Sequence, residues 1–277
     1  MATTNASLSH LERTAEEPRD NSLYTVRLTH IDPINPTIRL FRLTPTNPPI
    51  KFLPGQWLDV YCPSIPKAGG FTITSPPSLP YLELAVQKSP ENPPAAWLWQ
   101  AVPSILNAEL QVRVGGSFVW PPPRGVVGLK RVVFVAGGVG VNPLMSMVSC
   151  IAERGPGEGV EVRFLYSVRE GGRVEEVLFL RRLVETFNML GKEGDLRIFF
   201  TGGRSSNGDV EIQGQTITTR RRRVTDQDLL EALGPVEERK DTVCYICGVP
   251  TMTDEFVEKA KKAEGMLEEN VLFEKWW

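Results

Sequence analysis

Three glycines stand where a buried strand meets a helix, and their spacing suits the binding of a phosphate group. Within Arg131–Pro143, the apolar run Val132–Val135 is typical of a strand that is covered on both faces. Gly137, Gly138 and Gly140 follow it and let the backbone turn tightly and approach a ligand closely. Because the N–H groups at the start of a helix can bind a pyrophosphate, we expect a nucleotide site here.

The residues beside and after these glycines are suited to begin a helix. Val139 lies within the turn, Asn142 is a favoured N-cap residue, and Pro143 is favoured at the first helical position. The glycine fingerprint of dinucleotide sites is only partly present, because Pro143 stands where its last glycine would be. A strand, turn and helix without a ligand is therefore the alternative interpretation.

A second set of candidate residues concerns the ribose of the nucleotide. Ser167 and Arg169 follow the predicted strand Val162–Tyr166, at the end where the adenosine ribose should lie. Ser167 can donate a hydrogen bond and Arg169 can contact a 2′-phosphate, whereas Glu170 follows directly and would repel that phosphate. We expect nucleotides with and without a 2′-phosphate both to bind, with a modest advantage for the phosphorylated form.

Four consecutive arginines, Arg220–Arg223, end the polar segment Gly202–Arg223. Structureless segments of this length are uncommon unless they are functional or disordered. We expect a solvated, mobile insertion. The alternative is that one of these arginines contacts a nucleotide phosphate.

The cysteines and histidines do not form a recognisable chemical site. Cys244 and Cys247 are three residues apart on a predicted strand, so their side chains face opposite ways. Neither a redox pair nor a zinc site is therefore expected. His10 and His30 have no metal-ligating neighbours in the sequence, and we interpret them as incidental.

The composition limits the class of protein. A chain of 277 residues with 41% hydrophobic residues can fill the cores of two domains. Its net charge of −2 gives no reason to expect nucleic acid or an anionic membrane as a partner, and no apolar run approaches the roughly 20 residues of a membrane helix. Four irregularly spaced cysteines indicate a reducing compartment, and the acidic start argues against a mitochondrial transit peptide. We expect a cytoplasmic protein, with a mitochondrial location less favoured.

The elements that must position these residues form two patterns behind a disordered arm, residues 1–20. From 21 to 125, short alternating runs broken by Pro and Gly predict a small antiparallel β-barrel. From 126 to 277, strands alternate with helices, which predicts an α/β domain with a parallel sheet. The strands expected in the barrel are Leu23–Ile31, Thr37–Leu43, Trp57–Tyr61, Phe71–Ile73, Tyr81–Val86 and Leu110–Val114, with one helix at Ala95–Val102. The α/β half should have strands at Val132–Val135, Val162–Tyr166, Leu196–Phe200 and Thr242–Ile246, and helices at Pro143–Ala152, Val174–Leu190, Gln227–Leu233 and Thr251–Gly265.

Seven short motifs occur in an order that resembles the ferredoxin–NADP reductase superfamily. They are Leu53–Trp57, Gly70–Ser75, Val114–Phe118, Ala136–Pro143, Tyr166–Arg169, Cys247–Met252 and Phe273–Trp277. The Gly-Phe-Thr-Ile-Thr-Ser form of the second and the Phe-Glu-Lys-Trp-Trp form of the last look closest to the oxidoreductase NAD-binding domain-containing branch.

The resemblance implies a flavin-binding barrel of the ferredoxin-reductase type at 21–125 and an NAD(P)-binding domain at 126–277. The cofactors it implies are FAD, with FMN less favoured, and NAD(P)H. In the barrel it places Phe71 against the flavin ring and the Thr72 hydroxyl at flavin N5, within a flavin-binding segment that continues through Ile73, Thr74 and Ser75.

In the α/β half the resemblance places Cys247 and Gly248 beside the nicotinamide. Glu274 resembles the C-terminal carboxylate of the family, and Trp276 or Trp277 the terminal aromatic residue that covers the ring. Thr72, Cys247 and Glu274 are thus the expected catalytic residues. From the residues alone, Phe71 and Cys247 are equally interpretable as core side chains, and the two tryptophans as closing a domain interface.

The chain departs from the family where the family holds the flavin phosphates. The arginine position of the family falls on Gly69, and Pro93–Ala96 lacks the usual serine, although Lys67 or Arg113 offers a possible substitute charge. The leading function is a flavin-dependent NAD(P)H oxidoreductase with an unidentified small-molecule or protein acceptor. The alternatives are a flavin reductase that uses diffusible flavin, and a regulatory nucleotide-binding protein with a decayed flavin site.

Overall fold

A computed structural model of the chain describes residues 9–47, 49–155, 159–169, 174–202, 208–212 and 215–275. Its contacts divide the chain into two compact units at the junction of Trp120 and Pro121. This division lies slightly before the boundary at 125 that the composition predicts.

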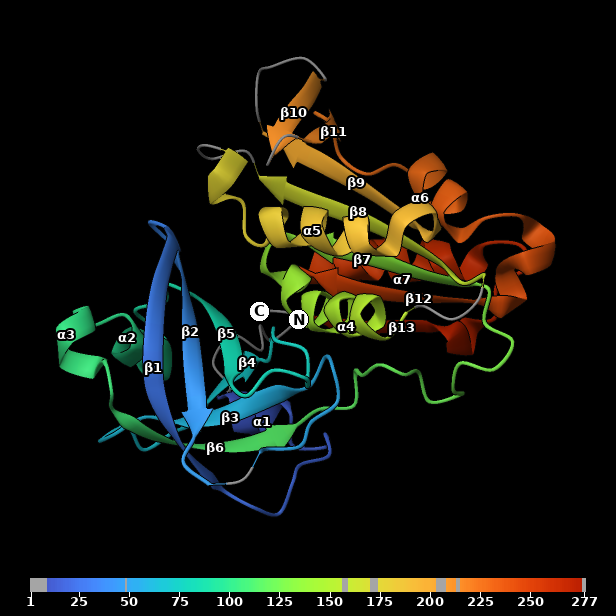
Figure 1. The fold of residues 1–277 in the computed structure, drawn as a ribbon. Coiled ribbons are helices and arrows are strands. Elements are labelled where there is room, and N and C mark those ends of the chain that lie inside the picture. The colour runs from blue at the N-terminus through green and yellow to red at the C-terminus, as the bar shows by residue number, and fades with distance from the viewer. Residues whose placement is uncertain are drawn as a thin grey trace, which may run out of the picture. The chain divides into compact units, whose positions relative to one another are not determined.

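The first unit is built on a six-stranded antiparallel sheet with the order β4-β3-β6-β1-β2-β5. A bridge between Ile73 and Leu84 joins the two ends of this order, so the sheet closes into the predicted barrel (Figure 1). The strands are β1 (Tyr24–Asn35), β2 (Ile38–Pro45), β3 (Trp57–Tyr61), β4 (Gly69–Thr72), β5 (Leu82–Gln87) and β6 (Glu109–Gly115).

Alternation along these strands separates an apolar interior from the outer face of the barrel. Leu58 of β3, Phe71 of β4 and Val114 of β6 all belong to the interior core. The intervening residues, such as Trp57 and Asp59, lie on the other face of the sheet, because successive side chains of a strand point to opposite sides.

Two short helices, α2 (Pro93–Leu98) and α3 (Val102–Ile105), replace the single helix expected at Ala95–Val102. The first begins earlier than expected because the Asn92 side chain caps it and prolines occupy its first two positions. Ala95 and Leu98 of α2 pack on the barrel core.

Residues 9–20 are ordered on the barrel, so the expectation of a disordered arm over 1–20 is wrong for them; residues 1–8 lie outside the described residues. Helix α1 (His10–Arg13) starts with a capping box between Ser9 and Glu12. His10 Nε2 lies 3.0 Å from Asp59 Oδ1, and Arg19 Nε donates to Asp59 Oδ2 over 3.1 Å. His10 is therefore not incidental: a buried carboxylate requires partners, and this segment supplies two of them.

The second unit contains a seven-stranded sheet with the order β10-β11-β9-β8-β7-β12-β13. All neighbouring pairs are parallel except β10 with β11, which confirms the predicted parallel sheet. The strands are β7 (Arg131–Gly137), β8 (Glu161–Arg169), β9 (Gly194–Thr201), β10 (Gly208–Ile212), β11 (Gln215–Arg220), β12 (Thr242–Gly248) and β13 (Val271–Lys275).

Helices cover both faces of this sheet (Figure 1). On one face α4 and α5 lie together, and Phe187 of α5 packs edge-on against Phe164 of β8 with 6.0 Å between ring centres. On the other face, Leu229 of α6 and Phe256 of α7 share a core with Val133 and Cys244 of the sheet. The helices are α4 (Val141–Arg154), α5 (Leu180–Leu190), α6 (Asp226–Leu233) and α7 (Pro250–Lys262), with 3-10 turns η2 (Gly138–Gly140), η3 (Val174–Glu176), η4 (Gly191–Glu193), η5 (Val236–Asp241) and η6 (Glu268–Asn270).

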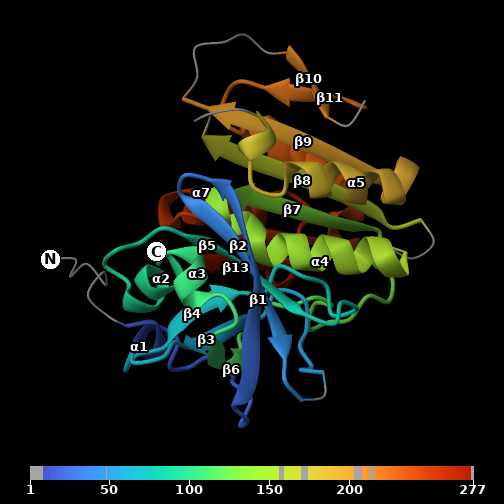
Figure 2. The same ribbon diagram turned by 60° about the vertical axis from the view of Figure 1, so that its left-hand side comes forward.

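The structure corrects two further expectations in this unit. The helix expected at Val174–Leu190 is interrupted, because Phe179 adopts a left-handed φ of 59° before α5 begins. The segment Gly202–Arg223 is not a structureless insertion: β10 and β11 form a hairpin, and β11 extends the sheet beside β9 (Figure 2). Residues 203–207 and 213–214 of that segment lie outside the described residues.

Candidate nucleotide-binding site

The predicted glycine turn, Gly137–Gly140, lies where the order of the parallel sheet reverses. The strands on either side of β7 are β8 and β12, and nucleotides bind at the carboxyl ends of strands at such a point. The register aligns Gly137 with Ser167 and Ala136 with Cys247, which is in turn aligned with Glu274. Candidate residues from four separate stretches of sequence therefore meet at one edge of the sheet.

Two glycines of the turn are required by packing within the protein. A Cβ atom on Gly137 would lie 2.3 Å from Met252 Sδ, and one on Gly140 would lie 2.3 Å from the Cys247 carbonyl oxygen. The turn after β7 is thus in tight contact with the turn after β12, and only glycine permits this approach.

Gly138 has a different environment from its neighbours. Its φ is +53°, it is exposed, and no atom of the described residues lies within 4 Å of the position that a Cβ would occupy. An open patch of backbone at the start of a helix is what a pyrophosphate needs for close approach.

Helix α4 begins at Val141, with Gly140 as its N-cap, so the assignment of Asn142 as the N-cap and Pro143 as the first helical residue is wrong. The 3-10 turn η2 leads directly into α4, so the helix begins earlier in the sequence than predicted. Asn142 and Pro143 are therefore buried within its first turn. Val139 is half-buried within η2. No side chain caps α4, so its start is not blocked by a competing oxygen from the N-cap residue.

The residues expected beside the nicotinamide lie at the ends of β12 and β13. Cys247 and Gly248 are buried at the end of β12, and Glu274 is half-buried on the edge strand β13. Trp276 and Trp277 lie outside the described residues. Burial raises the pKa of the Cys244 thiol to about 12, and neither Cys244 nor Cys247 is in a disulfide.

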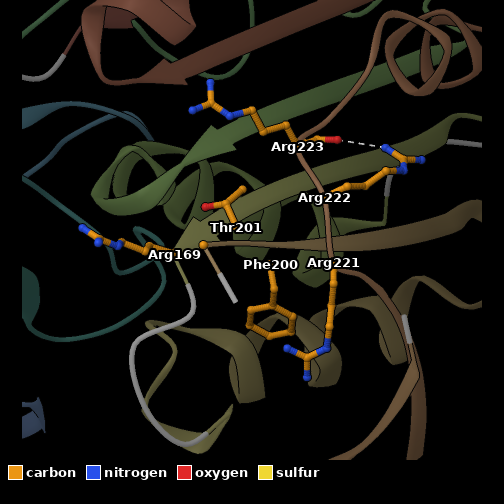
Figure 3. A pocket seen from close by; sticks show the side chains of 7 residues that line it. Arg169, Phe200, Thr201, Arg221, Arg222 and Arg223 are labelled. Carbon is orange, nitrogen blue, oxygen red and sulfur yellow. Dashed lines mark hydrogen bonds between the residues drawn. The ribbon is translucent and has the colours of Figure 1, made fainter. Parts of the chain in front are cut away.

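A pocket of about 490 Å³ lies beside this edge, where β8 and β9 end (Figure 3). It is lined by Arg169, Phe200, Thr201, Gly202, Arg221, Arg222 and Arg223. Arg169 lines this pocket, whereas Ser167 is not among the lining residues. Three of the four consecutive arginines reach the same pocket, because the β10–β11 hairpin returns the chain to β9.

The lining arginines differ in the partners that they already have. Arg222 pairs with Asp228 through both of its terminal nitrogens and donates to the Arg223 carbonyl oxygen over 2.9 Å. Arg221 lies over the Phe200 ring, 5.4 Å from its centre. Neither Arg169 nor Arg223 has a hydrogen bond or ion pair from its guanidinium within the part of the chain that the structure describes, so both are available to an anion.

Asp228 explains why Arg222 is not available in the same way. Burial by itself raises the pKa of Asp228, but hydrogen bonds from Arg222 and Thr225 and the charge of Arg222 outweigh it and hold that pKa well below its ordinary value. The carboxylate is therefore ionised at neutral pH and holds Arg222 in place.

The flavin segment expected in the barrel is buried. Phe71 is a member of the barrel core with 8% of its surface exposed. Ile73 forms the bridge to β5, the Thr74 hydroxyl donates to Glu83 Oε1 over 2.8 Å, and Ser75 Oγ accepts from the Glu83 N–H over 3.1 Å. These contacts join the end of β4 to β5, which is a structural role.

Thr72 has no such role. Its hydroxyl is buried, and no hydrogen-bond partner for it exists among the residues from 9 to 275 that the structure describes. Thr72 and Phe71 point to opposite faces of β4, so one ring can contact both only from the edge of that strand. β4 is the last strand in the order of its sheet, and the bridge that closes the barrel lies just beyond it, at Ile73. The edge of β4 opposite β3 therefore pairs with no strand among the described residues.

Sequence reasoning missed Phe200, Thr201 and Gly202 as pocket residues. Thr201 and Gly202 directly follow the third predicted strand, and the carboxyl end of each parallel strand lies at the nucleotide edge. The hairpin also left a signal, because Val210 and Ile212 alternate with polar residues before the Gln213-Gly214 pair.

Within the described ranges, no group of His, Cys, Asp and Glu side chains is arranged to hold a metal ion. The same residues include no helix with the length and apolar character needed to cross a bilayer.

Comparison with known proteins identifies the type of domain. Residues 134–258 match the family described as "Oxidoreductase NAD-binding domain". Over 280 residues the chain is 33% identical to the oxidoreductase NAD-binding domain-containing protein 1 of Xenopus tropicalis, which covers 97% of this chain and 84% of that protein.

Solved structures confirm the fold that the motifs imply. The cytochrome P450 reductase GcoB of Amycolatopsis superimposes with a TM-score of 0.71 at 18% identity, over 94% of this chain and 70% of that chain. A ferredoxin NADP+ reductase from Neisseria gonorrhoeae, with bound FAD and NADP, superimposes with a TM-score of 0.62 at 15% identity, over 93% of this chain and 99% of that chain.

Proposed function

The chain belongs to the family of the oxidoreductase NAD-binding domain-containing protein 1, and we propose that it transfers a hydride from NAD(P)H to a flavin. The observation that carries this proposal is the exposed, left-handed Gly138 at the reversal point of the sheet. It follows β7, in which Ala136 is aligned with Cys247 of β12, and Cys247 is aligned with Glu274 of β13. The electrons then pass to a separate acceptor, a small molecule or a protein.

In this proposal each residue has a limited physical task. The backbone at Gly138 and the start of α4 hold the pyrophosphate, and Cys247 and Glu274 border the nicotinamide. A bound flavin would supply the hydride-accepting N5 atom. The Thr72 hydroxyl would hold that atom, because a buried hydroxyl without a partner costs about 1–3 kcal/mol, and a ligand atom removes this cost.

The experiment that tests this function mixes the protein with NADPH and added flavin without oxygen and follows bleaching of the flavin absorbance. We expect bleaching much faster than in a protein-free mixture. Binding of NADPH without any acceleration would instead support the regulatory alternative, in which the flavin site has decayed.

Replacement of Thr72 by valine tests the flavin side of the proposal. Because valine has the same shape and no hydroxyl, we expect the free energy of unfolding to stay the same or rise. Flavin reduction should slow about fivefold, the equivalent of one hydrogen bond of about 1 kcal/mol. Thr72→Ser, which keeps the hydroxyl, is the matched control. A Thr72→Val variant that reduces flavin at the parent rate would remove Thr72 from the site.

The pocket of about 490 Å³ supports a preference for NADPH over NADH. Arg169 and Arg223 line it and have no carboxylate partner among the described residues, so a 2′-phosphate would gain charge-assisted hydrogen bonds there. Thr201 lines the same pocket, but its hydroxyl already lies 3.4 Å from the Val168 carbonyl oxygen.

We expect Arg169→Ala to raise the Michaelis constant for NADPH about tenfold or more and to leave that for NADH nearly unchanged. The loss of one charge-assisted bond costs roughly 1.5–3 kcal/mol, and only NADPH has the phosphate. Arg223→Ala should likewise raise the Michaelis constant for NADPH and not that for NADH. Arg181→Ala, at an exposed arginine of α5, is the matched control. Equal effects of Arg169→Ala on both nucleotides would show that this residue does not contact the 2′ position.

A further inference from the structure

The barrel does not fit the diphosphate of FAD, and we infer that the protein takes flavins as exchangeable substrates without distinguishing FAD, FMN and riboflavin. The inference rests on the proposed function, because it concerns the flavin that accepts the hydride. Three observations in the first unit carry it, and each concerns a place where a phosphate contact would be expected.

The first observation is the space beside Gly69, where the family has its phosphate-binding arginine. A Cβ atom on Gly69 would lie 2.6 Å from the Phe71 ring and 2.7 Å from Pro94 Cβ. Gly69 and Phe71 lie on one face of β4, and the Phe71 ring is part of the barrel core. The space that the first side-chain atom of an arginine would need is therefore filled by packed apolar atoms.

The second observation is the start of α2, which corresponds to the other phosphate contact. Pro93 and Pro94 occupy its first two positions and have no N–H group to donate. The next two N–H groups already donate to Asn92: that of Ala95 to its Oδ1 over 3.3 Å, and that of Ala96 to its carbonyl oxygen over 2.8 Å. A phosphate at this helix start would find no donor.

The third observation is that the candidate substitute charge Arg113 is already used. Its Nε and one terminal nitrogen donate to Asp59 Oδ2 over 2.9 and 2.7 Å. Asp59 lies in register with Gly70, whose side faces away from that of its neighbour Gly69. Arg113, which is held by Asp59, is therefore on the face of the sheet opposite to the one where Gly69 replaces the phosphate-binding arginine.

Two further cations of this unit lie at the other end of α2. Arg39 and Lys88 both lie against the Trp99 ring, and Trp99 is the C-cap residue of α2. The other substitute considered from the sequence, Lys67, is exposed, and its charge acts on Glu12, whose pKa it helps to lower. A single flexible surface lysine contributes little to affinity compared with a bidentate arginine.

Because the flavin is exchangeable, the reduced flavin leaves the protein after the hydride transfer. The C4–H bond of the dihydronicotinamide breaks, its hydride forms the N5–H bond of the flavin, and water supplies a proton to N1. The nucleotide is oxidised and the flavin is reduced by two electrons, so the dihydroflavin that leaves must be consumed by a separate reaction that oxidises free dihydroflavin.

The test measures the dissociation constants of riboflavin, FMN and FAD for the flavin-free full chain by quenching of flavin fluorescence. We expect the three constants to agree within about fivefold and the FAD constant to change little with salt, because no phosphate contact is present to be screened. FAD bound a hundredfold or more tighter than riboflavin, or FAD retained through gel filtration, would overturn the inference while leaving the proposed function intact. If none of the three flavins binds and none is reduced by NADPH, the proposed function fails, and the inference fails with it.

A pair of lysine variants controls for the one remaining charge. We expect Lys67→Ala to leave the ratio of riboflavin to FAD dissociation constants unchanged, as should Lys51→Ala, at another exposed lysine of the same unit. A tenfold fall of that ratio in Lys67→Ala alone would show that Lys67 holds the diphosphate, and the inference would be wrong.

Discussion

Replacing Asp59 by asparagine is expected to lower the free energy of unfolding by roughly 3–5 kcal/mol, the usual cost of breaking a buried ion pair from one side. The Asp59 carboxylate is completely buried and is contacted by His10, Arg19 and Arg113. Removing its charge leaves these groups facing a neutral amide. The measurement is urea denaturation of the full chain, and a loss below about 1 kcal/mol would show that the cluster is not a main support of the barrel.

Asp32→Asn is the matched control for this change. Asp32 also pairs with a histidine, His30, over 2.9 Å, but both side chains are about half exposed. Because exposed ion pairs contribute little, we expect a change within about 0.5 kcal/mol. A comparable loss in both variants would mean that burial of Asp59 does not set the cost.

Acid should weaken the same cluster. Burial raises the pKa of Asp59, but hydrogen bonds from His10 and Arg113 and the charge of Arg19 lower it by more, so its native pKa is below the ordinary value. The stabilisation is therefore complete above the unfolded pKa of about 4 and is lost as the pH falls through the native pKa. The parent should lose stability over this range more steeply than Asp59→Asn.

The second large effect is expected at the glycine turn. Gly138→Ala should weaken NAD(P)H binding at least tenfold, because its methyl group would enter the open space through which we propose that the pyrophosphate approaches the backbone. The fold should stay cooperative, since none of the residues that the structure describes has an atom within 4 Å of that position. Calorimetric titration gives the affinity, and an affinity equal to that of the parent would exclude the turn from the site.

Gly191→Ala separates the loss of binding from backbone strain. Gly191 has a φ of +59°, close to the +53° of Gly138, and likewise has no atom within 4 Å of its missing Cβ. Both alanines should lower stability by a similar amount, about 1 kcal/mol, for the left-handed conformation. Only Gly138→Ala should lower the affinity for the nucleotide, because Gly191 ends α5, away from the carboxyl ends of the strands.

The two fold classes and the position of the glycine turn could be predicted from the residue pattern alone. Apolar residues recur at every second position across 21–125, whereas strand-like and helix-like spacings alternate across 126–277. This spacing indicates which side chains are buried, and therefore whether a segment forms a strand or a helix. The run Val132–Val135 is entirely apolar and is buried on both faces of the sheet. The glycines that follow it marked the turn, because only glycine fits the close packing at Gly137 and Gly140.

The pairing of distant segments could not be predicted from the sequence, because it depends on tertiary contacts. The edge strand β13 has few buried side chains of its own, and its pairing with β12 brings Glu274 beside Cys247. The β10–β11 hairpin is too polar for its alternation to be decisive, and its place beside β9 brings Arg221–Arg223 to the pocket at Arg169.

Whether the space beside Gly69 in the barrel is open or filled also depends on tertiary packing. The sequence shows that Gly69 replaces an arginine, but only packing shows that the Phe71 ring and Pro94 fill the space. Likewise, no local pattern predicts that His10 and Arg19 pair with Asp59, because these contacts span 49 and 40 residues. A periodic pattern reports whether a side chain is buried, whereas the partner of a buried charge depends on segments that only folding brings together.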